Sequence, residues 1–360
     1  LMDSFGNRLA LVGITTSRHD PVGRWVKKSI NGIEYDFFAI ARYNRALTRN
    51  VIPDRLVNFL FAKYYKKRIL GIGINNIFVQ RHESMIAISG PEMNICYSFA
   101  GLDNPLSISK YSYAGLVAKW FERKFFRKIG YAGTILARGD DDAIRDMLSR
   151  SNGTMINHII IKFPTRIRTA IFKPMDRNVV RAGLDLPQEG TYVITTGRLA
   201  WLKGWKFMID SFALFAEQVP AARFIMVGEG EDYDKIITYV AEKDISDKVS
   251  LVGKKAREEI ALYLNASDLY IMGSYKEGWP TALMEAVACG LPACATEFSS
   301  VGDIILEGIN GFIDRGRDEI AFAADIVKAL EFERPVRNDH VTRFSTENLK
   351  EDLLGYWKLT

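Results

Sequence analysis

The sequence contains few cysteines and histidines, and this scarcity limits the chemistry that it can support. Its 360 residues include three cysteines and four histidines, and none has the paired spacing typical of a zinc site. The cysteines, Cys96, Cys289 and Cys294, lie in apolar surroundings, which favours buried thiols over a disulfide framework. We therefore expect a protein of a reducing compartment that uses no metal and no other cofactor.

Long hydrophobic runs, low-complexity tracts and internal repeats are also missing. No apolar run approaches the roughly 20 residues that a membrane span requires, so we expect no membrane-spanning helix. Charged residues make up 25% of the chain and apolar residues 48%, which excludes a disordered protein. Because 360 residues exceed the usual size of one hydrophobic core, we expect two domains.

Charge is unevenly divided along the chain, although the total is only +5. Residues 1–173 carry 27 Lys or Arg against 13 Asp or Glu, a net charge of +14, whereas residues 174–360 carry 21 against 30, a net charge of −9. A basic half suits phosphates, an anionic lipid surface or nucleic acid, although such charge also serves solubility alone. No nucleic-acid recognition motif accompanies the charge, so we expect no nucleic-acid partner.

Short apolar runs alternate with amphipathic, helix-length stretches in the second half, a pattern typical of a parallel sheet covered on both faces. Strands are predicted at 191–196, 222–227, 249–252, 268–272 and 292–295. Helices are predicted near 204–218, 231–242, 255–265, 280–289 and 318–331. Open α/β sheets bind ligands beyond the carboxyl ends of their strands, so we expect the functional site at that edge.

The first half has the same α/β character. Strands are predicted at Leu9–Ile14, Ile33–Ala39, Asn76–Val79, Met85–Ile88, Asn94–Ser98, Thr134–Ala137 and Ile156–Ile161. Helices are predicted at Asp54–Ile69, Tyr113–Ile129, Asp140–Leu148 and, at the end of the chain, Thr346–Lys358. Phe163–Met175 has the composition of a linker, and Leu1–Gly6 has the pattern of a helix end. We therefore expect that a first strand and its loop are missing before Leu1.

A basic loop follows the strand predicted at 191–196. Gly197 permits a tight turn, and Arg198 and Lys203 place two cations beside the start of a helix. Backbone N–H groups and the helix dipole favour an anion at such a position. The loop therefore suits a diphosphate, whose negative charge grows as a sugar leaves, although a solvated basic loop is the plainer interpretation.

A second motif combines two carboxylates with a helix start. Glu277 lies in a loop after a strand, Pro280 begins the helix, and Glu285 lies about two turns further along. The two carboxylates can therefore contact different parts of one extended ligand, each accepting vicinal hydroxyls such as those of a ribose or a hexose. Free N–H groups of Trp279 and Thr281 are expected to meet phosphates of the same ligand.

Four motifs follow one another over about residues 160–315: Gly-Arg-Leu-x(3)-Lys-Gly, Val-Gly-Glu-Gly, Glu-Gly-Trp-Pro-x(4)-Glu-Ala and Ala-Cys-Gly-Leu-Pro. In order and spacing they resemble glycosyltransferase family 4. The resemblance implies an α/β protein of the GT-B class, with two facing Rossmann-like domains, parallel sheets and an inter-domain cleft. It implies an acceptor-side domain of residues 1–172 with 346–360, and a donor-binding domain of residues 173–345. It also implies a retaining hexosyltransferase that takes a UDP- or GDP-sugar as substrate and requires no metal.

The resemblance further implies roles for individual residues. Arg198 and Lys203 are similar to the family's diphosphate-binding pair and would act in catalysis. Glu277 resembles the carboxylate that contacts the donor sugar, also counted as catalytic, and Glu285 resembles the ribose-binding carboxylate. In full, the donor-binding residues implied are Gly197, Arg198, Lys203, Gly228, Gly230, Val252, Glu277, Gly278, Trp279, Pro280, Thr281 and Glu285.

One stretch departs from the family pattern. Many members have a histidine after a central strand of the first domain, where its side chain approaches the donor sugar. The comparable stretch here, Tyr97–Gly101, contains no histidine. His82 is therefore a candidate catalytic residue that would reach the cleft from a neighbouring strand end, although a lone histidine is more often structural.

Cations and aromatic rings interleave at 59–68 and 116–128, as in helices that lie in a membrane interface. Packing helices with basic outer faces are the other interpretation. We expect a cytoplasmic enzyme, peripheral on the inner face of the cytoplasmic membrane through its basic N-terminal domain. Its acceptor would be a glycan or lipid-linked glycan in bacterial-type polysaccharide or glycolipid synthesis. A nucleotide-sugar epimerase and a non-catalytic nucleotide-sugar-binding or scaffold protein remain the alternatives.

Overall fold

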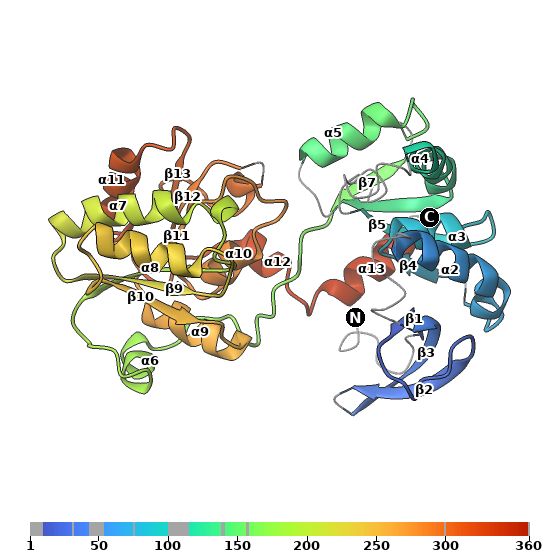
Figure 1. The fold of residues 1–360 in the computed structure, drawn as a ribbon, viewed down its shortest axis with the longest axis horizontal. Helices are drawn as coiled ribbons and strands as arrows, with labels where there is room; N and C mark the ends of the chain where they lie inside the picture. Colours follow the sequence, from blue (N-terminus) through green and yellow to red (C-terminus); the bar gives the residue numbers. More distant parts are fainter. Residues whose placement is uncertain are drawn as a thin grey trace. The chain divides into compact units, whose positions relative to one another are not determined.

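The computed structural model describes residues 10–30, 32–42, 54–74, 76–99, 115–137, 141–155, 158–298 and 300–358. The chain divides into two compact units (Figure 1). Unit 1 comprises Leu1–Pro164 and Glu347–Thr360, and unit 2 comprises Thr165–Thr346. Unit 2 is therefore inserted into the chain of unit 1. The helix end expected at the start of the sequence lies outside the described residues.

Unit 2 is built on a six-stranded sheet in which all neighbouring strands are parallel. The strand order is β10-β9-β8-β11-β12-β13. The strands are β8 (Thr191–Thr196), β9 (Ala222–Val227), β10 (Val249–Gly253), β11 (Leu269–Met272), β12 (Ala293–Thr296) and β13 (Gly311–Asp314). The first five confirm the predicted strands to within one residue. β13 was not predicted, because four residues that begin with glycine and end with aspartate give a weak strand signal.

Helices cover both faces of this sheet. Neighbouring residues of β8 enter different cores, since Val193 packs with residues of α7, α8 and α11 whereas Tyr192 and Ile194 pack with residues of α9 and α10. A strand buried on both faces is apolar at nearly every position, which made these strands predictable. The helices are α6 (Arg177–Gly183), α7 (Trp205–Gln218), α8 (Tyr233–Glu242), α9 (Arg257–Ala266), α10 (Thr281–Ala288), α11 (Glu319–Ala329) and α12 (Asp339–Arg343). Helices α7 to α11 confirm the five predicted, and α6 and α12 are additional.

Unit 1 contains two sheets within its described residues. One is parallel, in the order β4-β5-β6-β7, and the other has the order β1-β3-β2, with β2 antiparallel to β3. The strands are β1 (Ala10–Thr15), β2 (Trp25–Ile30), β3 (Ile33–Arg42), β4 (Asn76–Val79), β5 (Asn94–Phe99), β6 (Ala132–Ala137) and β7 (Ile159–Lys162). The helices are α2 (Asp54–Leu70), α3 (His82–Ile88), α4 (Gly115–Ile129), α5 (Asp141–Arg150) and α13 (Leu349–Lys358).

Two features of unit 1 differ from the predictions. Met85–Ile88, predicted as a strand, forms the second half of α3, because a short buried apolar run fits a strand and a helix equally well. Strand β2 has no predicted counterpart, since the paired lysines Lys27 and Lys28 interrupt its alternation. Leu9, Asp140 and Ile156, at the ends of predicted elements, lie outside the described residues.

The segments that enter and leave unit 2 are hydrogen-bonded to one another. The Ile167 N–H donates to the Phe344 carbonyl at 3.0 Å, and the Thr346 N–H donates to the Ile167 carbonyl at 2.8 Å. After Thr346 the chain returns to unit 1 as α13, where Leu353 is fully buried against Cys96 and Leu136. The ends of unit 2 are therefore held side by side.

Candidate active site

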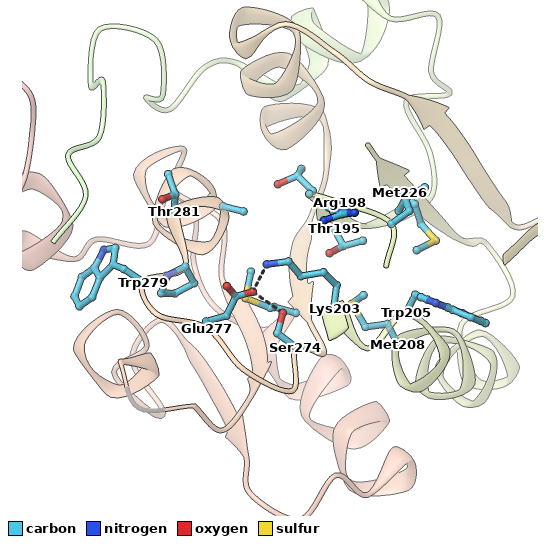
Figure 2. A pocket seen from close by; sticks show the side chains of 16 residues that line it. Thr195, Arg198, Lys203, Trp205, Met208, Met226, Ser274, Glu277, Trp279 and Thr281 are labelled. Atoms are coloured by element: carbon cyan, nitrogen blue, oxygen red, sulfur yellow. Dashed lines mark hydrogen bonds and ion pairs between the residues drawn. The ribbon is translucent and has the colours of Figure 1, made fainter. Parts of the chain in front are cut away.

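A pocket of about 210 Å³ lies at the carboxyl ends of β8, β9 and β11 in unit 2 (Figure 2). This is the edge of the sheet at which the sequence predicts the site. Its lining comes mainly from the loops that follow β8 and β11 and from the first turns of α7 and α10. The lining residues are Thr195, Thr196, Gly197, Arg198, Leu199, Lys203, Trp205, Met208, Met226, Met272, Ser274, Glu277, Trp279, Pro280, Thr281 and Ala282.

The structure brings part of the predicted site together in this pocket. The predicted residues that line it are Gly197, Arg198, Lys203, Glu277, Trp279, Pro280 and Thr281. The predicted residues of unit 2 outside the lining are Gly228, Gly230, Val252, Gly278 and Glu285. Thr196 and Ser274 line the pocket and were not predicted as site residues.

Lys203 and Glu277 form an ion pair at the centre of the pocket. The Lys203 ammonium donates to the Glu277 carboxylate at 2.6 Å, and the Ser274 hydroxyl donates to the same oxygen at 2.7 Å (Figure 2). The Glu277 side chain is 11% exposed and that of Lys203 is 35% exposed, so water screens the pair only in part. The ion pair thereby joins two loops whose residues are 74 positions apart in the sequence. The Lys203 ammonium can still bind a second anion.

Arg198 lies at the rim of the pocket in a weaker ion pair. Its Nε donates to Glu231 at 2.9 Å, and the two side chains are 70% and 52% exposed. Exposed pairs of this kind contribute about 0–1 kcal/mol. A phosphate can therefore displace Glu231 from Arg198 at little cost in free energy.

Thr196, the last residue of β8, offers a further polar group. The residue lines the pocket, and its hydroxyl oxygen is buried, with no hydrogen-bond partner among the described residues. A buried hydroxyl without a partner costs about 1–3 kcal/mol, so a ligand that supplies the partner recovers that free energy. The position directly before Gly197, at a strand end, is the sequence signal that identifies this residue.

The backbone of Gly228 and Gly230 packs closely against the backbone of the basic loop. A Cβ atom at Gly228 would lie 1.8 Å from the Gly197 carbonyl oxygen, and one at Gly230 would lie 2.0 Å from the Leu199 carbonyl oxygen. The Gly197 N–H donates to the carbonyl of Val227, the last residue of β9, at 2.9 Å. The Leu199 N–H donates to the carbonyl of Glu229, just beyond that strand, also at 2.9 Å. Only glycine permits this backbone contact, which holds the loop bearing Arg198.

Glu285 lies in α10 and is partly buried. Burial raises the pKa of its carboxyl to about 7, against an opposing effect of the nearby Arg257.

The expectation that the Thr281 N–H at the start of α10 is free is wrong, because it donates to the Trp279 carbonyl at 2.9 Å. The Gly253 carbonyl at the end of β10 accepts a hydrogen bond at 2.9 Å from the N–H of Gly228, the residue that follows β9.

His82 lies in unit 1 as the first residue of α3. Its Nδ1 is hydrogen-bonded to the Tyr97 hydroxyl, and its ring lies 4.9 Å from that of Phe125 and 6.2 Å from that of Phe99, centre to centre. These contacts account for its place in the aromatic core of unit 1. A catalytic role for His82 stays a prediction.

Unit 1 presents cations and exposed apolar groups together on α2 and α4. We call Leu60, Lys63, Lys67, Trp120 and Lys124 the basic aromatic surface. Leu60 is 55% exposed and Trp120 46% exposed, and the Lys124 ammonium lies 4.6 Å from the Trp120 ring centre. Burial and the neighbouring Lys63 lower the pKa of Lys124. No helix in the described part of the chain has the length and hydrophobicity to cross a membrane.

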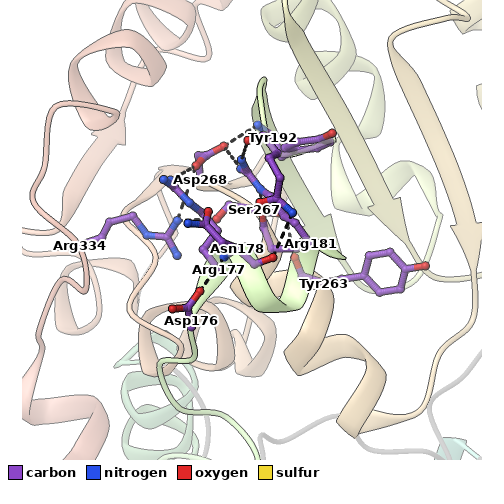
Figure 3. Close-up of polar contacts among 11 residues, drawn as sticks. Asp176, Arg177, Asn178, Arg181, Tyr192, Tyr263, Ser267, Asp268 and Arg334 are labelled. Carbon is purple, nitrogen blue, oxygen red and sulfur yellow. Dashed lines mark hydrogen bonds and ion pairs between the residues drawn. The ribbon is translucent and has the colours of Figure 1, made fainter. Parts of the chain in front are cut away.

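A second polar cluster lies at the amino ends of β8 and β11, away from the pocket, where arginines converge on Asp268 (Figure 3). The carboxylate accepts hydrogen bonds from Arg177 at 2.5 Å, Arg181 at 2.6 Å and the Tyr192 N–H at 2.8 Å. Arg334 lies 3.8 Å away. The Arg181 side chain is 2% exposed and also donates to two backbone carbonyls. The cluster ties α6 and the chain before α12 to the start of the sheet.

Unit 2 matches a known protein family. Residues 176–345 fit the family model of the glycosyl transferases group 1, a range that contains the whole pocket. Unit 2 is a group 1 glycosyl transferase domain. Its ion pair of Lys203 and Glu277 and its basic loop therefore belong to the part of the chain that the family model matches.

Curated relatives of this glycosyl transferase domain include the amylovoran biosynthesis glycosyltransferase AmsK of Erwinia amylovora, 28% identical over 181 residues. The D-inositol 3-phosphate glycosyltransferase of Stackebrandtia nassauensis is 29% identical over 208 residues. The two matches cover 49% and 53% of this chain. They cover 40% and 47% of the relatives, so the matched part spans less than half of their length.

Solved structures resemble the chain over both units. Sucrose-phosphate synthase from Thermosynechococcus elongatus has a TM-score of 0.66 at 18% identity, covering 96% of this chain and 87% of its own. Anabaena HepE in complex with UDP has a TM-score of 0.66 at 17% identity, covering 91% and 87%. These likenesses confirm the predicted GT-B class of α/β fold.

Proposed function

We propose that this protein is a retaining glycosyltransferase that moves a hexose from a UDP- or GDP-sugar to a glycan acceptor, without a metal. The observation that carries the proposal is the pocket of the glycosyl transferase domain, which the ion pair of Lys203 and Glu277 lines together with Arg198 and Thr196. HepE, which has the same fold, is solved with UDP and with UDP-glucose, which supports a nucleotide-sugar donor.

In the proposed reaction the acceptor hydroxyl attacks C1 of the donor sugar on the face from which the nucleoside diphosphate departs. The new C1–O bond forms as the bond from C1 to the phosphate oxygen breaks, and the leaving phosphate takes the proton of the hydroxyl. Negative charge grows on the diphosphate, where Arg198 and Lys203 oppose it. Glu277 holds the Lys203 ammonium and is placed to accept hydroxyls of the donor sugar.

A thermal titration with UDP, GDP and ADP tests donor binding. We expect UDP or GDP at about 100 times its Kd to add roughly 2.7 kcal/mol to the stability of unit 2. Arg198→Ala and Glu285→Ala should abolish the effect, because they remove the groups proposed to bind the diphosphate and the ribose. Lys206→Ala is the matched control, since Lys206 is exposed and lies over Tyr239.

Each result of the titration has a defined meaning. If no nucleotide stabilises the protein, donor binding is refuted and the glycosyltransferase proposal falls with it. If a nucleotide binds but no sugar is transferred, the scaffold alternative replaces the enzyme. Products formed from the donor in the absence of an acceptor separate the epimerase alternative, because an epimerised nucleotide-sugar needs no acceptor.

Nucleotide affinity is expected to depend on pH through Glu285. Its carboxyl has a pKa raised to about 7, and only the ionised form accepts two ribose hydroxyls. Affinity should therefore fall as the pH drops from 8 through 7, approaching tenfold per pH unit below the pKa. Isothermal titration between pH 8 and 5.5 measures this, and Glu285→Gln should bind weakly at every pH. An affinity of the wild type that is flat over this range would refute the role.

The same pKa shift acts on the stability of the protein without ligand. The pKa of Glu285 is higher in the folded protein than in the unfolded chain, so the protonated carboxyl favours the folded state. This contribution to the free energy of unfolding is largest below about pH 4.5. That contribution is lost as the pH rises through about 7. A bound ribose reverses the preference, since it favours the charged carboxylate.

For localisation, we propose that the basic aromatic surface docks the protein on the inner face of the cytoplasmic membrane, next to a lipid-linked acceptor. The support is the combination of exposed Leu60 and Trp120 with Lys63, Lys67 and Lys124 on two adjoining helices. Apolar side chains enter the interface while each cation near an anionic leaflet contributes about 1 kcal/mol.

Sedimentation with phosphatidylglycerol vesicles at low salt tests the docking. We expect wild-type protein to sediment, and the double variant Lys63→Glu and Lys124→Glu to bind at least about tenfold more weakly. Lys206→Glu with Lys254→Glu makes the same charge change on unit 2 and should leave binding intact. Failure of the wild type to sediment, or equal loss in both double variants, would refute the surface.

A further inference from the structure

We propose that Trp201, stacked on Tyr275, is a platform that binds a sugar ring of the acceptor beside the donor pocket. The inference rests on the proposed glycosyl transfer and adds the place at which the acceptor is held. It concerns residues of unit 2 alone. Neither ring lines the pocket itself.

The two rings form a stack with one open face. Their centres are 4.6 Å apart and their planes differ by 14°. The Arg317 guanidinium lies 3.7 Å from the centre of the Tyr275 ring and covers its other side. Trp201 is 63% exposed and Tyr275 45% exposed, so the indole face that does not meet Tyr275 is open to solvent.

The stack is held in place by the loops that build the donor pocket. Arg317 donates to the carbonyls of Gly273 at 2.6 Å and Ser274 at 3.2 Å, and the Tyr275 N–H donates to the Leu202 carbonyl at 2.9 Å. Arg317 has a left-handed φ of 53°, a conformation that a residue with a side chain adopts only when its surroundings enforce it. The rings are thus pre-organised, which lowers the entropy lost when a ligand binds.

The position of the stack relates it to the reaction. Trp201 precedes Lys203 by two residues, and Tyr275 precedes Glu277 by two residues, so both rings lie on the loops whose ends form the central ion pair. Lys276, the residue after Tyr275, is exposed and supplies a hydrogen-bond donor on the same loop. Because their chain neighbours Lys203 and Ser274 line the pocket, the two rings lie beside its edge.

The chemistry of the platform favours a sugar ring. A pyranose presents a face of C–H groups with slight positive charge, which suits the negative face of an indole, while its hydroxyls lie at the edge where polar groups reach them. Rigid indole rings bind with little loss of entropy. A nucleobase can stack in the same way, so the test separates the two.

Saturation-transfer NMR with the methyl glycosides of glucose, galactose, mannose and N-acetylglucosamine tests the platform. We expect at least one glycoside to receive saturation from the wild type, and the signal to fall at least fivefold in Trp201→Ala. Trp201→Phe should retain most of it, because a flat ring remains. The control Ile309→Ala removes an exposed apolar side chain elsewhere in unit 2 and should change nothing. Unchanged thermal midpoints verify that the variants fold.

Nucleotide affinity measured on the same samples separates this inference from the proposed function. We expect UDP or GDP to bind Trp201→Ala within twofold of the wild type. A loss of nucleotide affinity in Trp201→Ala would assign the ring to the base and overturn the platform, as would equal glycoside signals in both proteins or no signal in the wild type. If the wild type binds glycosides but no nucleotide, the proposed function fails, and Trp201 stands as a sugar-binding ring without the role of holding an acceptor.

Discussion

Asp268→Asn is expected to lower the free energy of unfolding of unit 2 by about 3 kcal/mol. The substitution keeps the shape of the side chain but removes the one carboxylate on which Arg177, Arg181 and Arg334 converge. Arg181 is 2% exposed, so its charge remains buried without compensation, and breaking a buried ion pair costs about 3–5 kcal/mol. Urea unfolding measures the loss, with hydrogen exchange in residues 191–196 and 269–272 assigning the transition to unit 2.

Glu307→Gln is the matched control for this change. Glu307 also pairs with an arginine, at 2.6 Å from Arg315, but the side chains are 42% and 56% exposed. Removing one charge from such a pair should change the unfolding free energy by less than about 1 kcal/mol. Similar losses in the two variants would show that burial does not set the strength of the Asp268 cluster.

Lys203→Ala is expected to lower kcat by about 10²–10³ with a smaller change in KM. Loss of one group that opposes developing charge in a shielded site has an effect of this size. The variant also leaves the Glu277 carboxylate, which is 11% exposed, without its ion-pair partner, although the Ser274 hydroxyl still donates to it. An uncompensated negative charge then lies where the diphosphate is proposed to depart. Steady-state transfer from the donor that the nucleotide titration identifies gives both constants.

Two further variants define the reason for that loss. Ser274→Ala removes one hydrogen bond from Glu277 and keeps the ion pair, so we expect kcat to fall by less than about tenfold. Lys206→Ala removes an exposed cation from the first turn of α7 and should leave both constants unchanged. If Lys203→Ala raises KM alone, the lysine binds the donor equally in the ground and transition states and does not act in catalysis.

Unit 2 was more predictable from sequence than unit 1, for a physical reason. Strands such as β9 and β11 are buried on both faces, so nearly every residue is apolar and the turns at their ends are polar. In unit 1 the apolar run Met85–Ile88 is too short to distinguish helix from strand, and β2 carries two adjacent lysines. Local patterns therefore identify buried parallel strands and fail for short or charged elements.

The site was predictable in its residue types but not in its pairings. The basic loop and Glu277 follow the carboxyl ends of β8 and β11, which are neighbours in the sheet, so topology alone brings them near one another. The 2.6 Å pair of Lys203 with Glu277 depends on side-chain conformations that spacing does not encode. The position of Thr196 before Gly197 is a sequence signal for the residue, but the lack of a hydrogen-bond partner for its hydroxyl is not. Such features emerge only from packing.

The insertion of unit 2 within unit 1 has a consequence for synthesis on the ribosome. All of Thr165–Thr346 leaves the exit tunnel before α13, which lies after it in the chain, can join unit 1. Until then Cys96 and Leu136 lack the helix that buries Leu353 against them. Domains fold as units while the chain grows. A nascent chain therefore carries a finished glycosyl transferase domain while the core that precedes it is still open.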